Sequence, residues 1–237
     1  MELNRKEPDA YEQVPLWTFS NHPNPAVVLD KNRHYDVDDD AWYHDVMEQM
    51  RAEWLAIGLD VPVSQMFFSG FCSQGDGACF DACTIDWGTF WPQLKGTYYF
   101  LSRFKQHLPQ PTLYHTGRYN HELSVVISLD DTYGYAENAM IDDALQQRFQ
   151  GQRASRHSGY TADYALWNDL TVRYTPRFCN ELDELESELI DLLREKMREL
   201  YAALEEEYDY LTSNDLLMEC FTDTGFLFAE DGTIHYV

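Results

Sequence analysis

The sequence predicts an α+β fold: an antiparallel sheet packed with helices, a long C-terminal amphipathic helix and a terminal β-hairpin. Three patterns lead to this prediction. Two short runs rich in aromatic residues flank a Gly-Asp-Gly sequence at residues 75–77, which is typical of a tight connection between strands. Apolar residues, most of them leucine, recur at intervals of three or four residues between positions 182 and 211, as on one face of a helix. Asp231-Gly232 lies between two short apolar runs and indicates a hairpin turn.

Two earlier segments have helical patterns. Trp42, Val46, Met50 and Trp54 recur at every fourth residue and predict a helix that ends near residue 58. The segment 87–107 has a similar apolar spacing, and its proline lies in the first turn, where a helix tolerates proline. A shorter helix is expected from residues 213–215 to residue 225.

Four segments have the character of strands, with alternating or continuous apolar and β-branched residues. They are residues 67–71, 78–85, 112–119 and 123–129. Because consecutive pairs are joined by short connections, we expect them to form one antiparallel sheet of four strands.

The chain is expected to consist of an extended, proline-rich arm at residues 1–38 and a single α+β domain at residues 39–237. The arm contains four of the nine prolines and has no clear periodicity. Within it, only residues 26–29 resemble a strand.

The chain is strongly acidic, with a formal net charge of −24 over 237 residues. Long-range repulsion therefore disfavours direct binding to nucleic acid or to an anionic membrane, and cationic partners are favoured. The same acidity would also serve solubility alone.

The five cysteines are odd in number and unevenly spaced, which indicates reduced thiols. No apolar run approaches the ~20 residues of a membrane span. We expect a protein of the cytoplasm that does not bind membranes.

The turn at residues 73–77 has two interpretations. In the first, Gln74 and Asp76 cap their own turn and the glycines serve only the bend. In the second, Ser73, Gln74, Asp76 and the exposed backbone N–H groups hold a ligand, because glycine permits close approach of the backbone. The turn lacks the Gly-Lys-Ser/Thr of a phosphate-binding loop and the third glycine of a dinucleotide fingerprint.

A second polar cluster extends from His115 to Glu122 and crosses a predicted bend. If its strands pair beside the first hairpin, the two clusters would line one cleft around a small polar ligand. The alternative is that these are ordinary polar residues at a sheet edge. The candidate ligand-binding residues are Ser73, Gln74, Gly75, Asp76, Gly77, His115, Arg118, Tyr119 and His121.

Five arginines form a cationic island in this acidic chain, and they either pair with the acidic helices or complete an anion site. They are Arg148, Arg153, Arg156, Arg173 and Arg177. Between residues 181 and 211 the balance is reversed, with twelve acidic and three basic residues, so we expect an acidic ridge that faces solvent or a basic partner.

Metal and cysteine chemistry are weakly indicated. A zinc site from Cys72, Cys79, His115 and His121 has suitable ligand types, but the spacing of its cysteines is wider than usual. Cys79 and Cys83 lie on a predicted strand, where small buried thiols are normal, so a nucleophile paired with His115 is not favoured. We expect no metal and no cofactor.

The longest motifs add a resemblance. They are Phe68-Ser-Gly-Phe-x-Ser-Gln-Gly-Asp-Gly-Ala-x-Phe80, His115-x-Gly-Arg-Tyr-x-His-Glu122, Leu200-Tyr-x-x-Leu-Glu-x-Glu-Tyr-x-Tyr-Leu-Thr-Ser213 and a closing Phe-x-x-Asp-Gly. Over residues 39–237 the chain resembles a family of small accessory proteins of tailed bacteriophages and prophages, which are often labelled antitoxin-like. The resemblance implies an accessory protein expressed in the bacterial cytoplasm, and it implies no mechanism.

Three functions are compatible with these patterns. The first is a non-catalytic counter-defence protein that sequesters a small nucleotide-like or anionic ligand. The second is an acidic interaction module that imitates the charge of DNA and occupies a basic host protein. The third is a hydrolase or nuclease with His115 or His121 as general base and Asp76 as its orienting group or metal ligand. Whether the protein is an enzyme stays open, with the non-catalytic hypothesis preferred. The long helix also allows pairing with a second copy as a homodimer.

Overall fold

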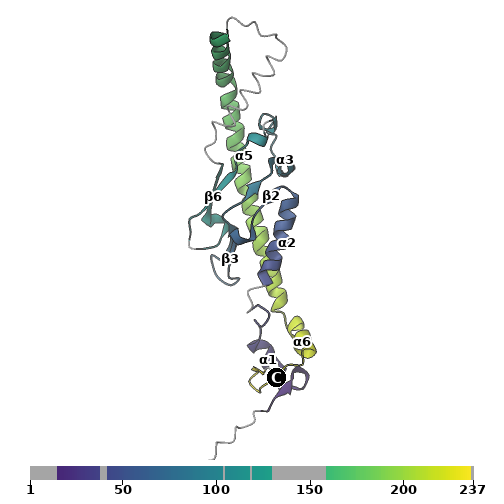
Figure 1. Cartoon of the computed structure of the whole chain (residues 1–237). Coiled ribbons are helices and arrows are strands. Elements are labelled where there is room, and N and C mark those ends of the chain that lie inside the picture. Colours follow the sequence, from purple (N-terminus) through teal and green to yellow (C-terminus); the bar gives the residue numbers. More distant parts are fainter. Residues whose placement is uncertain (1–14, 38–41, 104, 118, 130–158, 236–237) are drawn as a thin grey trace, which may run out of the picture. The chain divides into compact units, whose positions relative to one another are not determined.

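The computed structural model describes residues 15–37, 42–103, 105–117, 119–129 and 159–235. The chain has the predicted α+β fold, with short antiparallel sheets, a long helix near the C-terminal end and a terminal hairpin (Figure 1). Its described residues pack as two compact units. We call residues 44–205 the central unit, and residues 1–43 together with 206–237 the terminal unit. The predicted domain division at residue 38 stays a prediction.

Helix α5 (Gly159–Leu211) is the longest element of Figure 1. Its apolar stripe is the predicted one, because Leu185, Leu189, Leu193 and Met197 are at most 1% exposed. The helix begins 21 residues before the predicted start at residue 180 and continues through Pro176. A proline inside a helix removes one backbone hydrogen bond and ordinarily interrupts the helix. The sequence therefore provided no reason to predict that the helix continues to the N-terminal side of Pro176.

Helix α2 (Trp42–Ala56) is the first predicted helix, and it buries Met47, Met50 and Trp54. The second predicted helix, at residues 87–107, is wrong. The structure has a single turn of helix, α3 (Trp87–Phe90), followed by the 3-10 turns η3 (Trp91–Gln93), η4 (Leu101–Arg103) and η5 (Lys105–His107).

Two glutamates of α5 explain why this segment is not a continuous helix. The backbone N–H groups of Lys95 and Gly96 donate hydrogen bonds to the side chain of Glu188, the latter at 3.0 Å. Those of Phe100 and Leu101 donate to Glu181 at 2.9 and 3.0 Å. Donors that a helix would pair with its own carbonyl groups are therefore taken by carboxylates of another element.

The same contacts correct part of the predicted acidic ridge. Glu181 and Glu188 point toward neighbouring backbone, and Glu186 accepts a hydrogen bond of 3.0 Å from the N–H of Leu129. Other acidic residues of the ridge are exposed as expected, and they include Asp183, Glu184, Asp191, Glu195 and Glu205.

The described residues of the central unit form three separate two-stranded antiparallel sheets instead of the predicted sheet of four strands. They pair β2 (Leu59–Asp60) with β5 (Thr84–Ile85), β3 (Met66–Ser69) with β4 (Gly77–Phe80), and β6 (Pro111–His115) with β7 (Val125–Leu129). Beside β5, the Gln110 amide exchanges hydrogen bonds of 2.7 and 3.0 Å with the N–H and C=O of Ile85. A side chain thus pairs with the backbone groups of Ile85 that another strand would use. Two further 3-10 turns, η2 (Val63–Gln65) and η6 (Glu122–Ser124), precede β3 and β7.

The terminal unit is built from both ends of the chain. A sheet of order β1-β8-β9 combines β1 (Trp17–Thr18) with the predicted terminal hairpin of β8 (Leu227–Phe228) and β9 (Ile234–His235). The 3-10 turn η1 (Phe19–Asn21), helix α1 (Pro25–Lys31) and the predicted short helix α6 (Asn214–Asp223) complete it. The core consists of Phe19, Val28, Leu217, Phe221 and Phe228.

The strand expected at residues 26–29 is wrong, because these residues lie in α1. Pro25 is at the start of that helix, where its fixed φ angle suits the first turn and its missing N–H has no cost. Val28 is fully buried in the core of the terminal unit. The described part of the expected arm therefore contributes to a packed unit.

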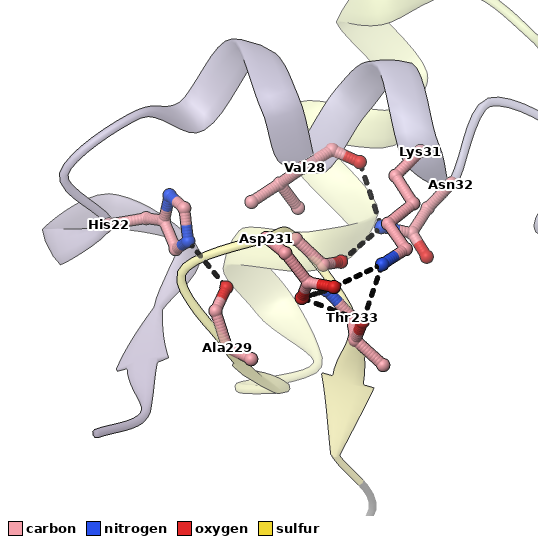
Figure 2. A network of polar contacts seen from close by, with 8 residues as sticks. His22, Val28, Lys31, Asn32, Ala229, Asp231 and Thr233 are labelled. Carbon is pink, nitrogen blue, oxygen red and sulfur yellow. Dashed lines mark hydrogen bonds and ion pairs between the residues drawn. The ribbon is translucent and has the colours of Figure 1, made fainter. Parts of the chain in front are cut away.

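A polar network joins the two ends of the chain within the terminal unit (Figure 2). Lys31 Nζ donates to Asp231 Oδ2 and to Thr233 Oγ1, both at 2.6 Å. The Asn32 amide donates to the carbonyl oxygen of Gly232 at 2.8 Å. The buried ring of His22 accepts from the N–H of Asn24 at 3.1 Å, so its other nitrogen carries the proton and donates to the Ala229 carbonyl at 2.8 Å.

Candidate functional site

The tip of the β3–β4 hairpin is organised by Asp76. Its Oδ2 atom accepts hydrogen bonds from the backbone N–H groups of Cys72 at 2.8 Å and Ser73 at 2.5 Å. The Asp76 N–H in turn donates to the Ser73 carbonyl at 3.2 Å. Asp76 therefore caps its own turn, while Ser73 and Gln74 are exposed.

Two glycines make this tip possible. Gly70 and Gly75 have φ angles of +50° and +97°, which side-chain-bearing residues rarely adopt. A Cβ atom at Gly70 would overlap the Asp76 carboxylate, and one at Gly75 would lie 3.3 Å from the ring of Tyr119. The first glycine makes room for the cap, and the second lets the tip pack against the Tyr119 ring.

The structure brings the two polar motifs of the sequence together. A Cβ atom at Gly77 would lie 3.0 Å from both the Asn120 carbonyl oxygen and the His121 ring. The Asn120 amide donates a hydrogen bond of 2.9 Å to the carbonyl oxygen of Phe68. The turn at residues 73–77 and the bend at residues 115–121 are thus in direct contact, whereas Arg118 lies outside the described residues.

The two histidines are engaged within their own bend. His115 Nε2 is 3.0 Å from the carbonyl oxygen of Tyr119. His121 Nδ1 lies 3.1 Å from the backbone nitrogen of Leu123, whose N–H donates to a neutral ring. The same atom lies 2.9 Å from Glu122 Oε2, which would pair with a charged ring. Glu122 Oε1 is also 3.7 Å from Arg198 Nη1. These contacts of His115 Nε2 and His121 Nδ1 stabilise the conformation of the bend.

The proposed cationic island is only partly described. Arg148, Arg153 and Arg156 lie outside the described residues, and the side chain of Arg173 does as well. Arg177 is exposed on α5. The role expected for these arginines in an anion site stays a prediction.

Sequence reasoning missed an apolar surface on the β6–β7 hairpin. Tyr114 and Val126 face each other across the two strands and are 68% and 54% exposed. Leu123 and Tyr119, in the connection between the strands, are 67% and 51% exposed. We call Tyr114, Tyr119, Leu123 and Val126 the hairpin surface. Strand alternation signals it, because Val125, Ile127 and Leu129 are buried and the residues between them must point outward.

Two cysteines of the central unit, Cys79 and Cys83, are poor candidates for chemistry. Burial raises the pKa of the Cys79 thiol to about 11, with a smaller contribution from the Asp81 charge. Burial also raises the pKa of Cys83 to about 12. Both are protonated near neutral pH, whereas a nucleophile or a zinc ligand must be a thiolate. Among the described residues, no group of three or more His, Cys, Asp or Glu side chains is placed to hold a metal ion.

Comparison with known proteins places most of the chain in one family. Residues 42–214 match a domain of unknown function, DUF8835. The chain belongs to the DUF8835 family. Neither a comparison with curated proteins nor one with solved structures found a match.

The DUF8835 domain contains both polar motifs, the hairpin surface and all of α5. It does not include residues 15–37, or the chain after residue 214 with β8 and β9. Within the described part of the chain, no helix has the length and apolar character that crossing a membrane requires.

Proposed function

We propose that this DUF8835 protein is a non-catalytic accessory protein that binds a basic partner protein through the hairpin surface. In keeping with the resemblance of its motifs to phage accessory proteins, we place this interaction in the bacterial cytoplasm, with a host protein as the partner. The observation that carries the proposal is the exposure of four large apolar side chains, Tyr114, Tyr119, Leu123 and Val126, within one hairpin.

The position of these side chains supports a binding role. In a two-stranded sheet with one face against a core, the opposite face normally carries polar residues. Here one cross-strand pair of that face is polar, Thr112 with Ser128, and the other is Tyr114 with Val126. Aromatic residues are enriched at protein interfaces because they bury a large area at a low cost in conformational entropy. The hairpin surface therefore has the composition of an interface core.

The charge of the chain supports a basic partner. At a net charge of −24, an acidic protein would be repelled and a basic one attracted over several ångströms beyond contact. Exposed carboxylates of α5, such as Asp191 and Glu195, contribute to this overall charge. Electrostatics would speed encounter, and the hairpin surface would provide the contact.

The other two functions find less support in the geometry. Asp76 would have to anchor a ligand, but one of its carboxylate oxygens accepts two hydrogen bonds within its own turn. His115 and His121 each have a ring nitrogen in contact with backbone of their own bend. The sequestered ligand at this tip and the hydrolase activity stay predictions.

Site-specific photo-crosslinking in bacterial cells tests the proposal. A photoreactive phenylalanine derivative replaces Tyr114 in one version of the full chain and Tyr99 in a matched version. Tyr99 is 78% exposed and lies elsewhere in the central unit. We expect a crosslink from position 114 to one basic polypeptide and none from position 99.

Confirmation requires the crosslinked polypeptide to bind the purified chain in isolation. Equal crosslinking from positions 114 and 99, or an acidic polypeptide at position 114, would overturn the proposal. A crosslink from position 99 alone would move the interface to another surface.

A further inference from the structure

We propose that the free edge of strand β6 binds an extended segment of the basic partner protein, which joins the β6–β7 hairpin as a third strand. This inference rests on the proposed function and deepens it, because it names the part of the partner that the hairpin receives and the bonds that hold it. The edge consists of the backbone groups of Leu113 and His115. It runs beside the exposed side chain of Tyr114.

The register of the hairpin decides which backbone groups of β6 point away from β7. Thr116 and Ser124 face each other just beyond the two strands, and the Thr116 N–H donates to the Ser124 carbonyl oxygen at 2.7 Å. In an antiparallel pair, hydrogen-bonded positions alternate with positions whose N–H and C=O groups point outward. Counting back along β6, the backbone groups of Leu113 and His115 therefore point outward.

Two other residues agree with this register. Pro111 occupies the next outward position, where its missing N–H takes no hydrogen bond from the ladder. Leu129 faces Pro111 from β7 and is therefore outward-facing as well. Its N–H donates to Glu186 at 3.0 Å. The outer edge of β7 thus has a hydrogen-bond acceptor from α5.

The outer edge of β6 has no such partner. Within the described residues, no hydrogen bond reaches the N–H or C=O group of Leu113 or the N–H of His115, and no third strand pairs with β6. Folded proteins usually protect a free edge with charged residues, a bulge or covering structure. Neither β6 nor β7 contains Asp, Glu, Lys or Arg, and Pro111 blocks only the first position. The edge therefore presents the donors and acceptors that an added strand uses.

Charge selects the occupant of this edge. A second copy of the chain would offer its own β6, but each copy has a formal net charge of −24 and would repel the other. A segment of a basic protein is attracted instead. One of its side chains would lie beside Tyr114 at the spacing of neighbouring strands, where aromatic and β-branched residues pack well. The occupant is therefore an extended basic segment with alternating apolar residues.

Amide hydrogen exchange followed by NMR tests the edge on the full chain. In the free protein we expect fast exchange of the Leu113 and His115 amides and slow exchange of the Tyr114 amide, which is bonded to β7. The probe is the capped peptide Lys-Thr-Val-Thr-Val-Thr-Lys, and the same peptide with Glu in place of Lys is the charge control. With about nine-tenths of the chain bound to the basic peptide, both outward amides should exchange about tenfold more slowly, because only the free chain exchanges.

Leu113→Pro is the most informative variant, because it removes one outward N–H group and leaves the bonds to β7 in place. Leu113→Ala is its matched control, since it removes the same side chain and keeps the N–H. We expect Leu113→Pro to bind the basic peptide about fivefold more weakly than Leu113→Ala, as for one lost backbone hydrogen bond. Slow exchange of the Val126 amide in both variants shows that the hairpin is folded.

Slow exchange of the Leu113 amide in the free chain would show that the edge is already covered, and it would overturn the proposal. The absence of protection by the basic peptide, or equal protection by the acidic one, would overturn it as well. So would equal binding by Leu113→Pro and Leu113→Ala.

The same exchange experiment with the polypeptide crosslinked from position 114 separates this inference from the proposed function. A partner that binds without protecting the Leu113 amide refutes the added strand and leaves the proposed function in place. Protection by the basic peptide without any crosslinked partner supports the edge site and refutes only the proposed function.

Discussion

Replacing Glu188 by alanine should destabilise the central unit more than any exposed glutamate of α5. Glu188 accepts hydrogen bonds from the N–H groups of Lys95 and Gly96 and, at 2.5 Å, from the Tyr98 hydroxyl. Burial opposes its ionisation, but the hydrogen bonds from Tyr98, Lys95 and Gly96 outweigh it and hold its pKa below the usual value. One charged side chain therefore fixes the chain between η3 and η4.

The expected loss of stability is about 2–3 kcal/mol. A hydrogen bond to a charged group contributes roughly 1.5–3 kcal/mol when water cannot replace it. Lys95 and Gly96 are exposed, so water would satisfy their N–H groups in the variant and their share is small. Tyr98 is only 5% exposed, so most of the loss comes from its hydroxyl, which would keep only the longer hydrogen bond of 3.3 Å to the Glu184 carbonyl oxygen.

Urea unfolding followed by tryptophan fluorescence measures this loss. Glu195→Ala is the matched control, since it makes the same substitution at an exposed position of the same helix. We expect a lower urea midpoint for Glu188→Ala. For Glu195→Ala, the free energy of unfolding should change by less than about 0.5 kcal/mol. Equal stability of the two variants would refute the role of Glu188 as an acceptor for the chain before η4.

Two further predictions concern the hairpin tip and the thiols. Asp76→Ala should lower the free energy of unfolding by about 1–2 kcal/mol in urea titrations, because two backbone N–H groups lose their acceptor, while Gln74→Ala should have almost no effect. Equal effects would contradict the capping role of Asp76. In thiol labelling at pH 8 followed by mass spectrometry, exposed Cys72 should react much faster than Cys79 and Cys83, whose pKa values are raised to about 11 and about 12. Labelling of Cys83 should accelerate as the pH rises toward 12, and rapid labelling at pH 8 would contradict its burial.

Local sequence patterns were sufficient to predict the helices with a regular apolar stripe and the terminal hairpin. The apolar stripe from Leu182 onward and the stripe of α2 predict the helices because each repeats at the helical period. Asp231-Gly232 likewise predicts the turn of the terminal hairpin, since Gly232 has a φ angle of +81°.

Contacts between distant residues explain what local patterns could not predict. The segment after α3 has a helical apolar spacing, but its N–H groups bond to glutamates more than 75 positions away. Gln110 occupies the backbone groups of Ile85, a pairing that no spacing in the sequence reveals. Residues 26–29 are apolar enough for a strand, and only the position of Pro25 distinguishes a helix start.

The closeness of the two polar motifs was predicted, whereas the apolar side chains beside them were not. The approach of Gly75 to Tyr119 and of Gly77 to His121 agrees with the expected closeness of the two motifs. The first interpretation of the turn is confirmed for Asp76, which caps it, and the sequence did not indicate that one oxygen would be shared by two donors. The exposure of Tyr114 depends on which face of β6 meets the core.

The most direct test of the proposed function is the affinity of the purified chain for its crosslinked partner, measured by calorimetry. The double variant Tyr114→Ser/Leu123→Ser removes half of the hairpin surface. The control Tyr99→Ser/Leu55→Ser removes two exposed side chains of the same types elsewhere in the central unit. A loss of about 2 kcal/mol at an interface hot spot predicts at least about 30-fold weaker binding for the first variant and unchanged binding for the second. Equal affinities of the two variants would contradict binding through the hairpin surface.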